Sequence, residues 1–395
     1  MLSFGRYFFV CVLSCILTIA MFAFSGERMQ AQAGEAMTPL LLKVEDAPVP
    51  FLGSDGRMHL VYELWTTNFS SANVRVEKVE VVGDGKVLQT LNAAEIATRL
   101  QPVGKRESVD KLEASSEALL FLHVTLAEGA PIPERLAHRV AIHAVAAPPG
   151  QQEITESGGE VAVNRRAVAM IGPPLNGEGY VSADSCCDAT RHTRAAMPIN
   201  GRVWLAQRYA VDWDQLDGEG YIRKQPQEKL ESYTIFGKPV LAVADAVVVA
   251  VTDGLPEQTP GKYPVDIPLN EADGNSVMLD LGEQRYAMYA HMQPGSIKVH
   301  KGDRVKLGQV IGLVGNTGNS VAPHLHFQVT GGPSSLASNG LPYEIRDFQV
   351  TGRTPGTKAF DEAEEKGTRL VATPISHQVK GALPLDQLVI SFVGR

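Results

Sequence analysis

Short apolar runs that end at glycine or polar residues follow one another through the second half of the chain, and they constrain its fold more than any other feature. The strongest examples are residues 240–244, 246–252, 276–281, 285–291 and 324–330. Runs of this length are typical of β-strands, and a glycine beside a strand permits a sharp bend or the close approach of another backbone. We therefore expect residues 167–350 to form a compact, strongly curved antiparallel β-sheet domain.

The stretch before this domain predicts a second all-β unit. Its runs of valine, leucine and aromatic residues are residues 59–67, 74–82, 118–126 and 139–145. Such spacing is typical of a β-sandwich, and 395 residues exceed the size at which one hydrophobic core usually keeps growing. The predicted order is a β-sandwich at 38–147, a linker at 148–166, the sheet domain at 167–350 and a C-terminal tail at 351–395. We expect a binding or spacer role for the sandwich.

Residues 1–33 have the composition of an export signal. Arg6 precedes the apolar run 7–24, and Ala31-Gln32-Ala33 follows it as a small-residue cleavage site. The run is close to the ~17–25 residues that can cross a bilayer, so an uncleaved inner-membrane anchor is the alternative to a cleaved signal peptide. Both alternatives predict an exported protein, periplasmic or extracellular.

Charge and motif content exclude several function classes. The formal net charge is −8 and 20% of residues are charged, whereas a nucleic-acid partner would require a basic surface. The glycine-rich residues 312–318 lack the Lys-Ser/Thr ending of a phosphate loop, so no nucleotide partner is expected. Beyond residue 33 the cysteines are the adjacent pair Cys186 and Cys187, which offers either a vicinal disulfide or two free thiols and no disulfide framework.

Histidines and one aspartate on strand-like runs are the candidates for chemistry. His324 and His326 are two residues apart, so a strand would present both from the same face. His291 ends the preceding hairpin, and Asp212 lies between Val211 and Trp213 in an otherwise apolar run. A buried carboxylate is costly unless it is paired or binds a cation, and Arg208 is its nearest sequence candidate for an ion pair. Paired imidazoles can bind a metal or transfer protons.

Five sequence blocks in a fixed order resemble the LytM/lysostaphin family of zinc metallopeptidases, which cut peptidoglycan cross-links. The resemblance covers roughly residues 191–329, and its blocks are residues 237–245, Tyr289-Ala290-His291, residues 301–312, residues 315–320 and Pro323-His324-Leu325-His326-Phe327. It implies an all-β protein in which the N-terminal β-sandwich is followed by a LytM-like antiparallel β-sheet peptidase domain.

The resemblance also implies roles for individual residues. Asp212 and His326 would be zinc ligands, and His324 would be the general base. His291 would stabilise the oxyanion or assist proton transfer. The implied cofactor is zinc, and the implied partners are the peptide stems or cross-bridges of peptidoglycan.

One position departs from the family pattern. The family's first ligand is a histidine four residues before the aspartate, and here that position is Arg208, which cannot bind zinc because guanidinium has no free lone pair. His192 could supply the missing ligand, with Cys186 or Cys187 as weaker candidates. Alternatively, Arg208 could be an oxyanion donor at a site that recruits His291 or His324 as a ligand. A third alternative is a metal-free, catalytically inactive protein that binds cell wall or activates another hydrolase. We expect a zinc-dependent endopeptidase.

Overall fold

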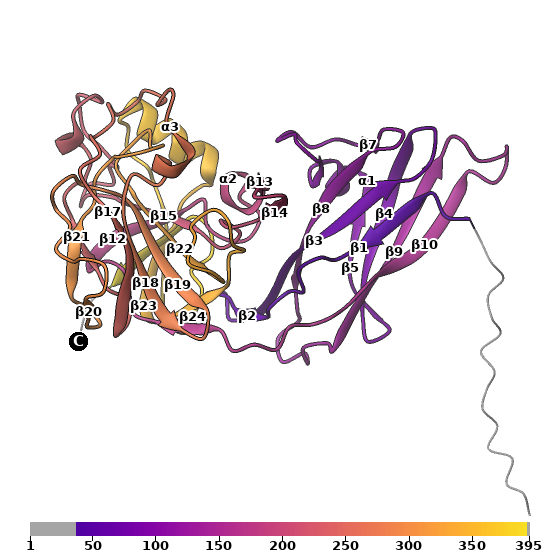
Figure 1. The fold of residues 1–395 in the computed structure, drawn as a ribbon, viewed down its shortest axis with the longest axis horizontal. Coiled ribbons are helices and arrows are strands. Elements are labelled where there is room, and N and C mark those ends of the chain that lie inside the picture. The colour runs from indigo at the N-terminus through magenta and orange to yellow at the C-terminus, as the bar shows by residue number, and fades with distance from the viewer. Residues whose placement is uncertain (1–36, 393–395) are drawn as a thin grey trace, which may run out of the picture. The chain divides into compact units, whose positions relative to one another are not determined.

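A computed structural model describes residues 37–392 of the chain (Figure 1). The predicted signal or anchor at residues 1–33 lies outside the described residues. Within residues 37–392, no helix combines the length and the apolar character needed to span a bilayer.

The N-terminal part of the described chain is a β-sandwich, as the sequence predicts. One sheet has the order β1-β3-β8-β6, with β2 beside β3; these strands are Leu40–Lys43, Met58–Asn68, Glu117–Thr125, Leu100–Pro102 and Phe51–Leu52. The other has the order β10-β9-β4-β5, with β7 beside β4; these strands are Glu153–Ala162, Arg135–Ala144, Val74–Gly83, Lys86–Asn92 and Lys111–Leu112. Helix α1 (Ala93–Ala97) follows β5.

Alternation of apolar residues explains why the two sheets pack face to face. The alternate residues Leu60, Tyr62 and Leu64 of β3 lie in the same buried cluster as Val79 of β4 and Val140 of β9. Residues of one alternation face share a side of the sheet, so the two inner faces together form one core.

Strand β10 occupies most of the region predicted as a linker. It pairs with β9 from Glu153↔His143 to Ala162↔Arg135 and completes the edge of the second sheet. The sequence of β10 did not predict a strand, because Ile154 and Val161 are its only large apolar residues. Such a polar composition is usual for an edge strand with one solvated face.

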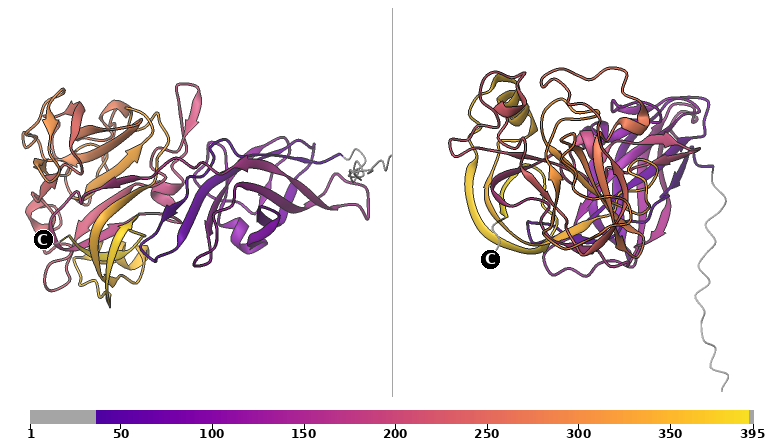
Figure 2. Two further views of the ribbon diagram at one scale, coloured as in Figure 1. Left: turned by 90° about the horizontal axis from the view of Figure 1, so that it is seen from below. Right: turned by 60° about the vertical axis from the view of Figure 1, so that its left-hand side comes forward.

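The second part of the chain is built on a long curved sheet of the order β11-β23-β25-β12-β15-β22-β19-β18-β17-β20, with β24 beside β23 (Figures 1 and 2). In chain order these strands are β11 (Ala169–Ile171), β12 (Gly177–Ala183), β15 (Val211–Gln215), β17 (Ala246–Thr252), β18 (Asn275–Gly282), β19 (Arg285–Met292), β20 (Arg304–Val305), β22 (Leu325–Thr330), β23 (Tyr343–Arg353), β24 (Thr373–Ala382) and β25 (Leu388–Phe392). Its pairs are antiparallel except β11 with β23.

Smaller elements flank this sheet. Strands β13 (Met197–Ile199) and β14 (Arg202–Trp204) form one hairpin, and β16 (Pro239–Leu241) pairs with β21 (Val310–Leu313). The helices are α2 (Thr190–Thr193), α3 (Thr357–Lys366) and the short 3-10 turns Leu230–Ser232 and Leu269–Glu271.

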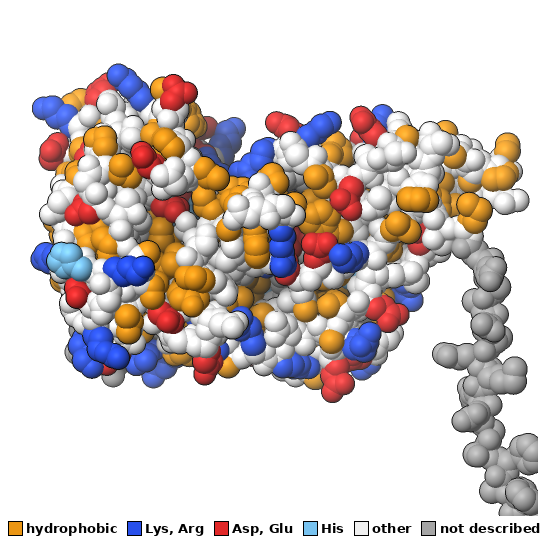
Figure 3. Space-filling view, in the orientation of Figure 1, with side chains coloured by type: hydrophobic (Ala, Val, Ile, Leu, Met, Phe, Trp, Pro, Cys, Tyr) orange, Lys and Arg blue, Asp and Glu red, His pale blue; other side chains and the backbone are white. Residues whose placement is uncertain are grey.

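One face of the long sheet carries its hydrophobic core. Trp213 of β15, Phe327 of β22 and Tyr289 of β19 are fully buried there, and Tyr289 packs edge-on against Phe327 with ring centroids 5.2 Å apart. The other face of β15 and β22 is free to carry polar side chains. On the molecular surface, acidic and basic side chains are interspersed (Figure 3), as the mixed charge of the sequence suggests.

Candidate metal centre

Strand pairing brings Asp212 and His326 together. Strands β15 and β22 are antiparallel neighbours in which Asp212 lies directly opposite His326. Val211 and Trp213 point into the core, so alternation turns Asp212 to the opposite face, beside His326 of β22 and His324, which directly precedes this strand. The two residues are 114 positions apart in the sequence, and strand pairing brings them together.

Three imidazoles surround the Asp212 carboxylate. Oδ1 lies 2.9 Å from Nδ1 of His326 and 3.4 Å from Nε2 of His324, and Oδ2 lies 3.3 Å from Nε2 of His192. The structure therefore places His192, which belongs to helix α2, at the same carboxylate as His324 and His326. One ligand atom each of His192, Asp212 and His326 lies within 4.8 Å of the others.

The electrostatics of this group favour an ionised carboxylate. Although burial opposes ionisation, His192 and His324 hold the pKa of Asp212 well below its usual range. Burial disfavours the charged form of His192, but the Asp212 carboxylate outweighs it and raises the pKa of His192. Burial also disfavours the charged form of His324, but the Asp212 carboxylate outweighs it and raises the pKa of His324 to about 10. Asp212 is therefore ionised, and its charge is balanced by protons on the neighbouring imidazoles, which a bound divalent cation would displace.

Hydrogen bonds to the outer ring nitrogens orient these histidines. Nδ1 of His192 donates to the carbonyl oxygen of Asp184 at 2.9 Å, so Nε2 is left for Asp212. Nε2 of His326 lies 2.9 Å from Oε1 of Gln328, whose Nε2 donates to the carbonyl oxygen of Ser335 at 2.8 Å. Because Gln328 uses its amide hydrogens on Ser335, its oxygen must accept from His326, and Nδ1 of His326 faces Asp212.

This donor set fits a divalent cation such as zinc. Two imidazole nitrogens whose opposite nitrogens already donate hydrogen bonds converge on one carboxylate, and two histidines with one carboxylate make the three protein ligands of a catalytic zinc site. Unless a proton or a cation lies between them, Nδ1 of His326 and Oδ1 of Asp212 would be two acceptors in contact at 2.9 Å.

His291 reaches the same site through an irregularity in its strand. Alternation alone would place His291 in the core with Tyr289. The β18–β19 register, however, shifts between Val277↔Tyr289 and Asn275↔Met292, so β19 holds one extra residue, and His291 has a φ of +59°. This bulge turns the His291 ring to within 4.8 Å of the His324 ring, between centroids.

The hydrogen bond of His291 fixes its tautomer, and its surroundings keep it neutral. Nδ1 lies 2.7 Å from the carbonyl oxygen of Thr317, which can only accept, so Nδ1 carries the hydrogen and Nε2 is free. Burial, together with His324 and His326, holds the pKa of His291 well below its usual value. On the other side, Nδ1 of His324 donates to the carbonyl oxygen of Ala322 at 2.8 Å, which leaves Nε2 of His324 facing the site.

Arg208 lies at the missing-ligand position but points away from the site. Its Nε and Nη2 donate to Oε1 and Oε2 of Glu63 at 3.0 and 2.6 Å, and both side chains are buried. The expectation that Arg208 could neutralise Asp212 is therefore wrong. The ion pair joins the sandwich strand β3 to the segment before β15, and Tyr209 adds a hydrogen bond to the carbonyl oxygen of Val61.

The cysteine pair lies in a different place from Asp212. Cys186 and Cys187 form a vicinal disulfide, and Cys187 lies beside His59 and His123 of the sandwich. The geometry thus favours His192 over the cysteines as the replacement ligand. His291 and His324, the other ligands considered from the sequence, form a second group with His326 whose ligand atoms also lie within 4.8 Å of one another.

Several residues of the site escaped sequence reasoning. Asp184 and Thr317 act through backbone carbonyl groups, for which no side-chain pattern exists. Gln328 could have been found, because it follows His326 by two residues and shares its face. Asp214 shares the face of Asp212 in the same way; burial and the nearby Glu364 carboxyl raise the pKa of Asp214 well above its usual value, which favours its neutral form.

Comparisons with known proteins find matches among peptidases. Residues 231–337 match Peptidase family M23, a range that holds His291, His324 and His326 but begins after Asp212 and His192. The chain is 29% identical over 167 residues to an uncharacterized metalloprotease of Haemophilus influenzae, covering 40% of this chain and 34% of that protein. It is 36% identical over 197 residues to the peptidoglycan DD-endopeptidase ShyA of Vibrio cholerae, covering 46% of this chain and 42% of that protein.

These matches span about a third to two fifths of the relatives' lengths. Among solved structures, the catalytic domain of lysostaphin from Staphylococcus simulans is 24% identical, with 42% of this chain and 88% of that chain covered and a TM-score of 0.23.

Proposed function

Because the chain carries a domain of peptidase family M23, the LytM/lysostaphin family, we propose that it is a zinc-dependent endopeptidase that cuts peptide cross-links of peptidoglycan. The observation that supports this most is the convergence of His192, Asp212 and His326 within 4.8 Å, because it supplies a third ligand in place of the family's histidine at position 208. Export to the periplasm or the cell exterior, by a signal peptide or with an inner-membrane anchor, is part of the same proposal and would bring the protein to this substrate.

In this proposal His192, Asp212 and His326 hold the metal. A bound zinc ion would supply a Lewis acid that polarises the scissile carbonyl group and acidifies water. Asp184 and Gln328 keep the ligand nitrogens of His192 and His326 pointed at the site through their hydrogen bonds to the opposite ring nitrogens.

His324 and His291 move protons in this proposal. Asp212 raises the pKa of His324, and a cation on Asp212 would remove that effect and leave His324 neutral. Nε2 of His324 then takes the proton of the attacking water and returns it to the amine that leaves, while Nδ1 stays bonded to Ala322. His291 keeps its hydrogen on Nδ1, so its Nε2 is an acceptor. Of the two roles that the family resemblance offers for His291, this form favours assistance in proton transfer over donation to an oxyanion.

The test measures metal and hydrolysis on the same preparations of the full chain. Wild type should contain about one zinc per chain, as expected for a mononuclear catalytic site, and should release soluble fragments from purified sacculi. His192→Ala should lose zinc and hydrolysis together, whereas His324→Ala should retain zinc and lose hydrolysis. His300→Ala is the matched control, because the His300 side chain is 90% exposed and belongs to none of the histidine groups that could hold a metal among the described residues.

Arg208 at a ligand position favours one competing function. A metal-free protein of this fold would bind cell wall or activate another hydrolase. Retention on sacculi without fragment release, with no zinc bound at any zinc concentration, would support this inactive alternative. Hydrolysis that persists in His192→Ala would instead show that His192 is not the replacement ligand.

A further inference from the structure

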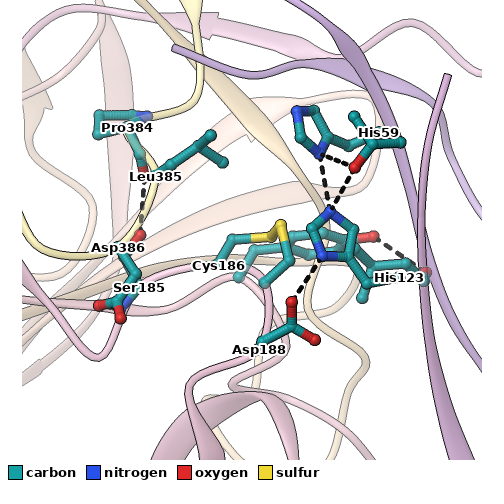
Figure 4. Close-up of a disulfide and its surroundings, with 12 residues drawn as sticks. His59, His123, Ser185, Cys186, Asp188, Pro384, Leu385 and Asp386 are labelled. Carbon is teal, nitrogen blue, oxygen red and sulfur yellow. Dashed lines mark hydrogen bonds and ion pairs between the residues drawn. A yellow bond between two sulfur atoms is a disulfide. The ribbon is translucent and has the colours of Figure 1, made fainter. Parts of the chain in front are cut away.

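Two histidines of the sandwich face each other at a second place in the molecule (Figure 4). His59 of β3 and His123 of β8 lie on neighbouring strands, and Nδ1 of His59 is 2.8 Å from Nε2 of His123. Their outer nitrogens are bound by carboxylates: Nε2 of His59 lies 2.9 Å from Oδ1 of Asp55, and Nδ1 of His123 lies 2.9 Å from Oδ2 of Asp188.

This arrangement is characteristic of histidines that bind metals. A metal-binding imidazole usually donates its other ring N–H to a carboxylate or carbonyl group, which orients the ring and directs its lone pair at the ion. When Asp55 and Asp188 both accept hydrogens, the inner nitrogens of His59 and His123 are two lone pairs in contact. One proton between them relieves that repulsion, and a metal ion would replace the proton.

A thiolate donor is available next to these nitrogens. The Sγ atom of Cys187 and one ring nitrogen of each histidine lie within 4.8 Å of one another. In the structure Cys187 is bonded to Cys186, so its sulfur can become a thiolate ligand after reduction. The hydroxyl oxygen of Thr125 lies 3.4 Å from Nδ1 of His59 and 3.3 Å from Nε2 of His123, so it is close to both of the facing ring nitrogens.

The disulfide lies at the wall of a cavity, although Cys186 and Cys187 are only 2% and 5% exposed. Cys186, Cys187, His123 and Asp188 line a cavity of about 730 Å³. The surrounding loop is held by other bonds as well: Ser185 donates from its backbone N–H to Asp386 and from its hydroxyl to the carbonyl oxygen of Pro384. The loop therefore keeps anchors that do not depend on the disulfide.

We propose that reduction of the Cys186–Cys187 disulfide creates a second metal site, in which Cys187 Sγ, His59 Nδ1 and His123 Nε2 bind a divalent ion such as Zn²⁺. A dithiol reductant delivers two electrons and two protons to the disulfide and becomes a disulfide itself. Metal binding then releases the Cys187 thiol proton and the proton between the two rings. The sandwich supplies both histidines and the loop before α2 supplies the sulfur, so the ion would join these two parts of the chain.

Cobalt is the probe that separates this site from the Asp212 site. The donors at Asp212 are nitrogen and oxygen, so Co²⁺ there gives no thiolate-to-cobalt charge-transfer band, whereas binding to Cys187 does. Metal-stripped full chain is titrated with Co²⁺ before and after treatment with a phosphine reductant. We expect reduction to add one further equivalent of bound cobalt together with this near-ultraviolet band.

A matched pair of variants tests the role of each sulfur. Cys186→Ser leaves Cys187 as a permanent free thiol, so it should show the band without reductant. Cys187→Ser, which differs by the position of one sulfur atom, should show no band in either state. His123→Asn and Asp188→Asn should each weaken the cobalt affinity of the reduced chain by about tenfold or more. His326→Ala should leave the band intact.

Two outcomes would overturn the proposal. One is the absence of the band both in reduced wild type and in Cys186→Ser. The other is a band of unchanged affinity in His123→Asn and Asp188→Asn, which would mean that the two thiols bind cobalt without the histidines. Neither outcome bears on the Asp212 site, whose zinc content and hydrolysis are measured separately.

Discussion

Replacing Arg208 by methionine should destabilise the protein strongly, although the residue takes no part in the candidate metal centre. The Glu63 and Arg208 side chains are only 2% and 6% exposed, and two hydrogen bonds of 3.0 and 2.6 Å join them. Arg208→Met leaves the Glu63 carboxylate buried without its partner. Breaking one side of a buried pair typically costs about 3–5 kcal/mol, and the near-complete burial here favours that range.

The double variant Arg208→Met/Glu63→Met isolates the cause. It removes both charges, so its free energy of unfolding should lie close to that of wild type, because well-packed apolar residues often replace a buried ion pair without loss. Urea unfolding followed by tryptophan fluorescence measures all three proteins. The control is Arg135→Met, whose partner Glu160 and own side chain are 68% and 62% exposed; it should change stability by no more than about 0.5 kcal/mol.

Acid gives an independent check on the mechanism. Burial already raises the pKa of Glu63 against the effect of Arg208, and loss of Arg208 should raise it further above its unfolded value of about 4.3. A carboxyl group whose pKa is raised on folding costs no stability at a pH where it is protonated in both the folded and the unfolded chain. The loss of unfolding free energy in Arg208→Met relative to wild type should therefore be small below about pH 4.3 and should grow as the pH rises. A loss equal to that of the exposed control, or a double variant as unstable as the single one, would refute the reasoning.

Three further predictions concern the metal centre. Because the pKa of His324 rises from about 6.5 to about 10 on folding, its contribution to the stability of the metal-free chain should be complete below about pH 6.5 and disappear by about pH 10; chelator-treated His324→Gln should lack this decline in urea unfolding. Gln328→Leu removes the acceptor behind the ligand histidine and should lower zinc affinity about 10- to 100-fold in chelator competition, with β-sheet circular dichroism unchanged. Gly274→Ala would push a methyl group, at a φ of +62°, against the carbonyl oxygen of Thr317 and should reduce hydrolysis; Gly282→Ala, also at positive φ but in open space, should retain it.

Alternation carried most of what the sequence could predict about the site. Two-residue spacing predicted that His324 and His326 project to the same side, although β22 begins one residue after His324. The apolar neighbours of Asp212 predicted that its carboxylate needs a partner or a cation. The first inference depends on local geometry, which the backbone repeats at every strand. The β-sandwich and the glycine-rich curved sheet follow from the same pattern.

Features that depend on distant partners could not be predicted. Glu63 lies 145 residues before Arg208, and nothing in either segment indicates their pairing. The turn of the His291 side chain away from the core and toward His324 depends on one extra residue in β19. This bulge becomes evident only when β19 is paired with β18. The polar pattern of β10 did not distinguish an edge strand from a linker, because an edge strand with one solvated face carries many polar residues, as a linker does.

The position of β25 has a consequence for how the chain must fold. This strand lies between β12 and β23, and it contributes Leu388 to Phe392 to a sheet whose other members begin at Ala169. While a ribosome is still making this segment, β12 and β23 lack their shared neighbour and expose unpaired backbone groups that invite aggregation. A chaperone that binds extended segments would therefore matter most between the synthesis of β23 and that of β25, and a stop codon before residue 388 should yield insoluble protein even though every residue of the metal centre has been made.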